Sequence, residues 1–535
     1  MRIILLCLLF TSCISELQVP SEDVVLVCTN DGCPKKKAPE GQGATDNNSD
    51  DSSDDSTPVP TVPDTGLAID DTFGSSGELD ITNYTNKMVI DSSDNIYLSK
   101  FIVDFASINA MGGFGDMDQN EIQIEKYNGN GTTSLFTFPT TPGTVAINNN
   151  RAQIAHNIPS SLKITSTNRL LSTVSMPLVA FQVSFEIFGG LLLTDTSGVL
   201  DTSFSTTGIL NFENHVDHIG NPFPPNPLLP IPATTLVGGP APAGKPTTNF
   251  AFLDSVEIGG NFYIAGFIED GGAMSYPNDY GDASNIEKRI LYKLDSSGAV
   301  DTTFGPTNTG YSFMQSNEVG VATRANKIEA HSTGVIIGGT KVSSGSKSLY
   351  VEKYNLSGAL DTSFGTGGMS EVGTQTANND FRLIDMIVDG TNIFLVSPNN
   401  IYKLDASGSL VGSFATSGVF TTENTRYSIY DVEVANSRVY IAGRDTQDSR
   451  AFVMILDQNG APLNDIGNSG TNSSIYQFSD ALGTFTIPTD VSATTEFYSN
   501  ITPISIGLQS DDDIIVSYYL AGSNTTRVVR LNLVE

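Results

Sequence analysis

The sequence predicts an all-β chain in which residues 66–535 form a single β-propeller, most simply of seven blades with about four strands each. The first observation is composition: 50 glycines, no tryptophan and only 16% charged residues suit turns and short strands better than long amphipathic helices. The second is periodicity, since apolar and polar residues alternate throughout and no long stretch repeats at helical spacing. The third is a short motif that recurs about every sixty residues along this part of the chain.

The first residues have the features of an export signal. Arg2 precedes an apolar run, Ile3–Phe10, that is too short to cross a bilayer. The following Ser12-Cys13 resembles the bacterial lipobox, in which the cysteine is acylated after cleavage. We therefore predict a signal peptide over residues 1–13 and a lipid attached at Cys13, with ordinary cleavage slightly downstream as the alternative. The lipoprotein would lie in the outer membrane or at the cell surface, and the alternative product would be periplasmic or secreted.

Residues 14–65 have the composition of a tether. Cys28 and Cys33 enclose a short turn, and in an exported protein such a pair predicts a disulfide. A metal site would need two further soft ligands, and none lies nearby in the sequence. From Pro34 to Thr65 the chain is rich in Asp, Ser, Asn, Gly and Pro and has few apolar residues, so we expect a disordered acidic linker.

The recurring motif is Leu-Asp-Thr-Ser-Phe-Gly, which is intact at Leu360–Gly365 and varied at four other places. Degenerate copies near Ser134 and Asn464 complete the series. A phenylalanine at one phase of five repeats suits the seam between two blades, because large aromatic side chains dominate such cores. The phenylalanines predicted to pack in the seams are Phe73, Phe204, Phe304, Phe364 and Phe414.

Each copy of the motif follows a strand that ends in Asx-x-x-Gly. Asp or Asn at the first position accepts a backbone hydrogen bond from two residues further on, and Gly at the fourth position supplies a positive φ. Repetition in successive repeats favours a structural turn over a metal-binding or catalytic role. The predicted turn residues are Asn128, Asp195, Asp295, Asn355, Asp405 and Asp457.

Paired apolar runs separated by hairpin-turn residues occur once in every repeat, for example Met88–Ile90 before Ile96–Leu98. Each pair is interpreted as a hairpin of one blade. The body begins with a copy of the motif, Ile69–Gly74, and ends with a strand of the kind that elsewhere precedes the motif, Thr526–Leu533. The N-terminal strand is therefore predicted to complete the last blade, which leaves no long unpaired edge.

The order of strand, Asx-x-x-Gly turn and Leu-Asp-Thr-Ser-Phe-Gly-Thr-Gly-Gly resembles the bacterial delta-60 repeat, most completely over Tyr292–Val372. The resemblance extends over nearly all of Gly66–Glu535. It implies a β-propeller of unknown function and implies no catalytic residues. The chain departs from the repeat by a blurred second copy, by inserted residues at 212–249 and by loss of the phenylalanine in the last blades.

The Pro-rich insertion at 212–249 is the first place to look for chemistry, because long loops on rigid scaffolds often carry binding residues. It contains His215, Asp217 and His218, which are residue types that bind metals. Their spacing matches no zinc pattern and a fourth ligand is lacking, so we expect a solvated loop and no metal site. No nucleophile elbow, phosphate loop or dinucleotide fingerprint occurs, so the sequence predicts neither an enzyme nor a cofactor.

The formal net charge of −32 disfavours duplex nucleic acid as a partner, and we expect a monomer that meets a membrane only through its lipid anchor. Two functions stay open. The first is a surface- or envelope-tethered scaffold for binding or adhesion, with an unknown protein or glycan ligand at the channel mouth. The second is an exported hydrolase or lyase that acts on polysaccharide. We favour the scaffold, and three or more titratable groups converging on the central channel would reverse this preference in favour of the enzyme.

Overall fold

The computed structural model divides the chain into two units, Met1–Thr61 and Val62–Glu535. The described residues run from 66 to 534, apart from 102–121, 139–153, 156–157, 181–183, 213–248, 270–286, 307, 309, 314–320, 344, 377–380, 423–425, 469–472 and 484–503. Outside them lie the predicted signal peptide and linker, Cys13, Cys28, Cys33, His215, Asp217 and His218. In the described part of the chain, no helix is long and apolar enough to cross a membrane.

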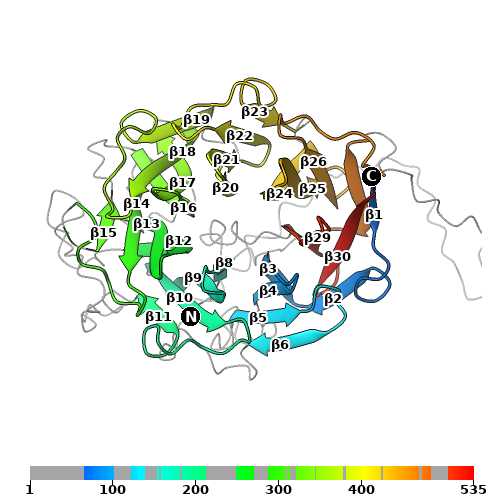
Figure 1. The fold of residues 1–535 in the computed structure, drawn as a ribbon, viewed down its shortest axis with the longest axis horizontal. Coiled ribbons are helices and arrows are strands. Elements are labelled where there is room, and N and C mark those ends of the chain that lie inside the picture. The colour runs from blue at the N-terminus through cyan, green and yellow to red at the C-terminus, as the bar shows by residue number, and fades with distance from the viewer. Residues whose placement is uncertain are drawn as a thin grey trace, which may run out of the picture. The chain divides into compact units, whose positions relative to one another are not determined.

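The second unit is a β-propeller, in which seven antiparallel sheets are arranged about one axis (Figure 1). This confirms the predicted fold class and the predicted number of blades. The innermost strand of each blade contacts the innermost strands of both neighbouring blades. These inner strands therefore form a closed ring around the axis.

The strands are numbered in chain order and run outward within each blade. Blade 1 contains β3 (Tyr84–Ile90), β4 (Ile96–Phe101), β5 (Ile122–Tyr127) and β6 (Ser134–Phe138). Blade 2 contains β7 (Ile154–Ala155), β8 (Ile158–Ile164), β9 (Arg169–Ala180), β10 (Ser184–Asp195) and β11 (Ile209–Phe212). Blade 3 contains β12 (Asn249–Ile258), β13 (Asn261–Glu269), β14 (Glu287–Leu294) and β15 (Tyr311–Phe313). Blades 4 and 5 contain β16 (Val321–His331), β17 (Gly334–Ser343), β18 (Ser346–Asn355) and β19 (Met369–Thr376); and β20 (Asp385–Asp389), β21 (Asn392–Val396), β22 (Asn400–Leu404) and β23 (Val419–Thr421). Blades 6 and 7 contain β24 (Tyr427–Ala435), β25 (Arg438–Asp445), β26 (Arg450–Leu456) and β27 (Ile475–Ala481); and β28 (Ile504–Leu508), β29 (Ile514–Tyr519) and β30 (Thr525–Val534), with β1 (Gly66–Ile69) and β2 (Glu78–Thr82) on the outside.

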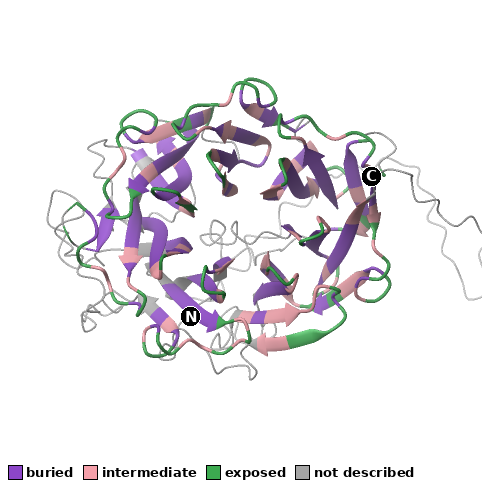
Figure 2. Ribbon diagram, in the orientation of Figure 1, coloured by how far each residue is buried: buried purple, intermediate pink, exposed green. Residues whose placement is uncertain are grey.

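The hydrophobic core is divided among the seams between neighbouring blades, and the buried strands alternate with exposed turns at the periphery (Figure 2). The seam between blades 3 and 4, for example, packs Tyr263 and Leu291 of one blade against Ile328 and Ile337 of the next. Comparable clusters occupy the other six seams. Each blade thus buries both faces against its neighbours, which explains why its strands are apolar on both sides.

The motif phenylalanine and the turn glycine meet across these seams. Phe304 is 1% exposed, and a Cβ placed on Gly358 of the next blade would come within 2.8 Å of its ring. Gly358 also has a φ of +84°, and the N–H of Gly305 donates to the carbonyl of Ser357 at 2.8 Å. The same ring-over-glycine contact recurs at Phe73, Phe204, Phe364 and Phe414, which pack over Gly131, Gly298, Gly408 and Gly460.

The Asx-x-x-Gly turns are closed by their own side chains. The Oδ1 atom of Asp295 accepts hydrogen bonds from the N–H groups of Ser297 (2.8 Å) and Ala299 (3.0 Å). Asp195, Asn355, Asp405 and Asp457 accept the same pair of bonds in their turns. Asn128 differs, because a register shift between β5 and β6 brings the N–H of Thr133 to its Oδ1 at 3.0 Å.

Residues from the N-terminal part of the body complete the last blade, as predicted. The outer edge of β30 pairs with two short strands: β1 lies beside its C-terminal half, with Leu67 opposite Leu533, and β2 lies beside its N-terminal half, with Leu79 opposite Val528. The first copy of the motif forms the turn between β1 and β2. Closure therefore depends on both ends of the described chain.

Candidate functional site

The aspartate of the motif, which the sequence analysis did not single out, forms ion pairs within the blades. The carboxylate of Asp301 lies 2.7 Å from Lys293, and that of Asp361 lies 3.2 Å from Lys353. The signal was present in the sequence, because a Lys stands two residues before the Asx of each of these turns. Since these groups recur with the repeat and are already paired, they serve the scaffold.

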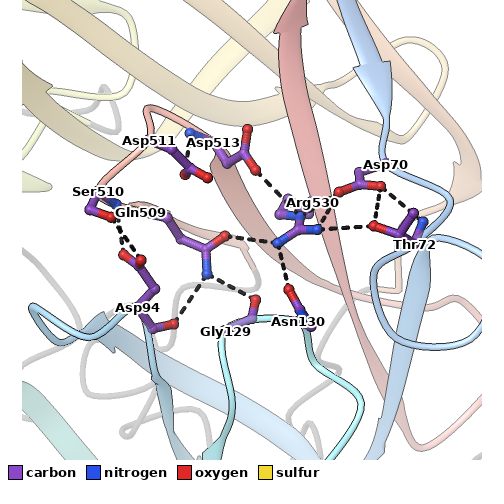
Figure 3. A network of polar contacts seen from close by, with 10 residues as sticks. All are labelled: Asp70, Thr72, Asp94, Gly129, Asn130, Gln509, Ser510, Asp511, Asp513 and Arg530. Atoms are coloured by element: carbon purple, nitrogen blue, oxygen red, sulfur yellow. Dashed lines mark hydrogen bonds and ion pairs between the residues drawn. The ribbon is translucent and has the colours of Figure 1, made fainter.

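The richest fully paired network lies where the ring closes between blades 7 and 1 (Figure 3). We call it the closure network: Asp70, Thr72, Asp94, Gly129, Asn130, Gln509, Ser510, Asp511, Asp513 and Arg530. At its centre, the guanidinium of Arg530 pairs with Asp70 (2.7 Å from Nε) and donates to Thr72 and Asn130 (both 3.2 Å).

The amide of Gln509 extends the closure network into blade 1. Its Nε2 donates to the carbonyl oxygens of Asp94 (3.1 Å) and Gly129 (2.9 Å), while the carboxylate of Asp94 accepts the N–H and hydroxyl of Ser510, both at 2.7 Å. Burial raises the pKa of Asp70, but hydrogen bonds from Thr72 and Arg530 outweigh it, so the net shift is downward. This network holds the ring shut.

A second group of charged side chains converges on the propeller axis. In five inner strands a β-bulge precedes one residue that faces the axis, namely Lys87, Ser161, Asp254, Lys327 and Asp431. The cross-strand pairing places Asp385 and Ser505 at the corresponding positions of β20 and β28. Two residues further along, the same face carries Lys163, Glu329 and Glu433. We call the eight charged residues of these two levels the axial cluster.

Ion pairs between blades 2 to 5 link five members of the axial cluster. The Nζ atom of Lys163, in blade 2, lies 2.9 Å from Asp254 in blade 3 and 2.9 Å from Glu329 in blade 4. Lys327 of blade 4 pairs with Asp385 of blade 5 at 2.6 Å. The inner strands that carry these residues face a common centre in Figure 1. The side chains of these five residues are 14–30% exposed, except that of Asp254 at 1%, so they are largely buried but four of them still reach solvent.

Three members of the axial cluster, Lys87, Asp431 and Glu433, are not used by these ion pairs. Lys87 in blade 1 and Glu433 in blade 6 make no hydrogen bond or ion pair with the described residues. Asp431, beside Glu433 on the same strand, accepts only the N–H of Ile506 in blade 7, at 2.9 Å. The equivalent bond from Ile328 to Asp254, at 3.0 Å, shows that such carboxylates also join the blades.

The unpaired groups have shifted pKa values. Burial raises the pKa of Glu433 to about 8, and the neighbouring carboxylates Asp431 and Asp385 reinforce this. Burial also raises the pKa of Asp431 to about 6. For Lys87, burial and the nearby Lys327 ammonium lower the pKa to about 8. Near pH 7 the axial cluster therefore presents an ammonium donor, a carboxylate acceptor and a neutral carboxyl that can donate.

A peripheral groove of about 560 Å³ offers a weaker candidate. It is lined by residues of blades 3, 4 and 5, and its floor contains the buried ion pair of Arg289 and Glu352. At its rim Lys341 pairs with Glu371 at 2.5 Å. Both ion pairs satisfy their charges internally, so this groove presents less to a ligand than the axial cluster does.

The residues predicted from the repeat lie away from the axial cluster. The five predicted phenylalanines are at most 2% exposed in the seams, and the six predicted turn residues close loops between outer strands. Within the described residues, no group of three or more His, Cys, Asp or Glu side chains is arranged to hold a metal ion. The axial residues did leave a sequence signal, because a charged residue stands in or beside the first apolar run of six of the seven hairpins.

No protein-family profile matches the chain, and no curated protein matches it either. Solved structures do resemble it remotely. A prolyl endopeptidase aligns at 10% identity and a TM-score of 0.37, over 83% of this chain and 45% of its own. The β-propeller domain of the Trilobed protease from Pyrococcus furiosus aligns at 8% identity and a TM-score of 0.35, over 85% of this chain and 96% of its own. Trypanosoma rangeli sialidase aligns at 9% identity and a TM-score of 0.33, over 84% of this chain and 55% of its own. Likeness this remote says nothing about substrate or activity.

Proposed function

We propose that this protein is an exported binding scaffold whose ligand site is the axial cluster. The observation that carries the proposal is the presence of two unpaired groups, Lys87 and Glu433, within a cluster whose other charges hold internal partners. Polar groups that a fold leaves unpaired are available to a ligand, and a propeller axis is where all the blades meet. The ligand would be a protein or glycan, and tethering through Cys13 would hold the scaffold at the cell surface.

A screen of the purified protein against glycan and peptide arrays tests this proposal. We expect a ligand that binds the wild type and is lost in the double variant Lys87→Met, Glu433→Gln. The matched control is Lys341→Met, which removes a lysine from the periphery and should bind as the wild type does. Binding that survives in the double variant, or no binding to any array member, would overturn the proposal.

The same geometry favours a second candidate, an exported enzyme that acts on polysaccharide. Lys87, Asp431 and Glu433 meet the condition of three convergent titratable groups. Asp431 and Glu433 stand two residues apart on one face of β24, which separates them by about 7 Å along the strand. Two neighbouring carboxyl groups with pKa values of about 6 and 8 suit the base and acid of a glycoside hydrolase.

The three convergent groups meet the condition set for preferring the enzyme, but we place the binding scaffold first because Asp431 already accepts a bond from the neighbouring blade, which an attacking base would have to give up. Incubation with a panel of polysaccharides, followed by measurement of reducing ends or unsaturated products, separates the two candidates. Product release that Glu433→Gln abolishes, while Lys341→Met retains it, would establish the enzyme. No product with any polysaccharide that the protein binds would exclude it.

A further inference from the structure

One arc of the axial ring, formed by blades 7, 1 and 2, differs from the rest in its chemistry. At the first of the two levels of the axial cluster, the inner strands of this arc carry Ser505, Lys87 and Ser161. Their cross-strand partners are Ser517, Ser99 and Thr173, whereas the same position in the other four blades holds Ala265, Gly338, Val396 and Ala442. This arc thus carries hydroxyl side chains at the cross-strand positions where the other blades have glycine or apolar side chains, and Lys87 is its one ammonium at this level.

Two of these hydroxyl groups are buried without a partner. The Oγ atoms of Ser99 and Ser161 make no hydrogen bond with the described residues, although these side chains are 0% and 5% exposed. Ser99 lies directly opposite Lys87 in the register of β3 and β4, so the two side chains share one face of the blade. Buried hydroxyl groups in native proteins nearly always have partners, so unpaired ones beside an unpaired ammonium point to a missing acceptor.

The acceptor that fits is a single negative charge. One ammonium with neutral hydroxyl donors matches a carboxylate, whose oxygens accept several hydrogen bonds at once. A doubly charged phosphate fits less well, because Asp254, Asp385 and Asp431 lie nearby and would repel it. On the side of blade 6, Glu433 and Asp431 can donate to and accept from hydroxyl groups of the same ligand.

We infer that the arc of Lys87, Ser99 and Ser161 binds the carboxylate of an acidic saccharide, whose hydroxyl groups reach Glu433 and Asp431. This inference rests on the proposed function and assigns the ligand class of the same site. A neutral saccharide would leave Lys87 unpaired. A peptide C-terminus would supply the carboxylate but lacks the hydroxyl groups that the blade 6 side can bind.

Calorimetry with oligogalacturonate, and with a neutral galactose oligosaccharide of equal length, tests the inference on the purified wild type. We expect the acidic oligosaccharide to bind at least about tenfold more tightly, since a charge-assisted hydrogen bond is roughly twice as strong as a neutral one. Equal affinities would overturn the inference without any need for a variant. A peptide that binds through Lys87 while oligogalacturonate does not bind would overturn the saccharide assignment.

Variants then locate the carboxylate. Lys87→Met should weaken oligogalacturonate binding about tenfold and Ser161→Ala about threefold, while both leave the neutral oligosaccharide unchanged. Lys87→Arg should retain most of the affinity, and Lys341→Met should behave as the wild type. Unchanged affinity in a folded Lys87→Met variant would contradict the inference. If a neutral ligand binds and Glu433→Gln removes it, the proposed function stands although the acidic preference fails; if no ligand binds at the axis, both fail.

Discussion

The closure network and the axial cluster are both built from charged and amide side chains, but they differ in how completely these groups are paired. Arg530 has partners for its guanidinium in three turns, which lie between β1 and β2, between β5 and β6, and between β28 and β29. Lys87, at the axis, has none among the described residues. A polar network that satisfies itself holds a fold together, whereas one that leaves groups unpaired is a candidate for binding.

We expect removal of the Arg530 guanidinium to lower the stability of the fold more than any change described below. A small loss would contradict the view that the closure network holds the fold together. Arg530 and Asp70 are 10% and 9% exposed, so Arg530→Met leaves a largely buried carboxylate without its partner. We expect the free energy of unfolding to fall by about 3 kcal/mol in urea denaturation at pH 7.

The control for this prediction lies on the same strand. Arg527 pairs with Asp80, which is 48% exposed, and with two other partly exposed carboxylates. Arg527→Met should therefore lower the free energy of unfolding by no more than about 1 kcal/mol. Equal losses in the two variants would mean that Arg530 does not hold the ring shut.

The next largest effect concerns a seam rather than a network. Gly358→Ala places a methyl group against the Phe304 ring at a φ of +84°, so left-handed strain and overpacking should together cost about 3 kcal/mol. Gly390→Ala has a φ of +60° but open space, so about 1 kcal/mol is expected. Thermal or urea unfolding of both variants measures the difference, and similar losses would show that the ring-over-glycine contact matters little.

A smaller effect on stability is expected in the axial cluster, and it depends on pH. Because the folded-state pKa of Glu433 is raised to about 8, deprotonation costs stability as the pH rises from its unfolded value near 4.5 through 8. Glu433→Gln removes this cost, so it should match the wild type at pH 4 and be more stable by about 1 kcal/mol at pH 9. Urea midpoints at the two pH values test this, with the peripheral variant Glu371→Gln as control. An equal gain at both values would contradict the raised pKa.

The smallest effect is on ligand affinity. Between pH 7 and 9 Lys87 loses its proton and Glu433 becomes ionised, while Lys327, Asp254, Asp385 and Asp431 also face this region. The affinity for oligogalacturonate should therefore fall about threefold over this range, and that for the neutral oligosaccharide should change less. Calorimetry at both pH values measures this. The fall should persist in Glu433→Gln, and a fall of equal size in Lys87→Met would exclude Lys87 as its cause.

The repeat was easier to predict where it was regular than where it had eroded. Phe136 packs over Gly198 of blade 2 as Phe73 packs over Gly131, but only an uncertain copy of the motif was located near Ser134. A register shift between β5 and β6 displaces the surrounding residues and disguises this copy. In the seam between blades 6 and 7, Ile466 takes the place of the aromatic, and its carbonyl accepts the N–H of Leu67 at 3.1 Å. The resemblance to the delta-60 repeat, the lipid at Cys13 and the Cys28–Cys33 disulfide stay predictions.

From the sequence alone came the blades and their closure, because strand alternation, Asx turns and hairpins depend on residues close together in the chain. The axial cluster needed the tertiary structure. Which side chains face the axis depends on a bulge in five of the seven inner strands, and which charges meet depends on a ring that brings Lys163 to Glu329 and Lys327 to Asp385. The pairing of such groups, and the lack of a partner for Lys87, arises only when distant blades converge on one axis.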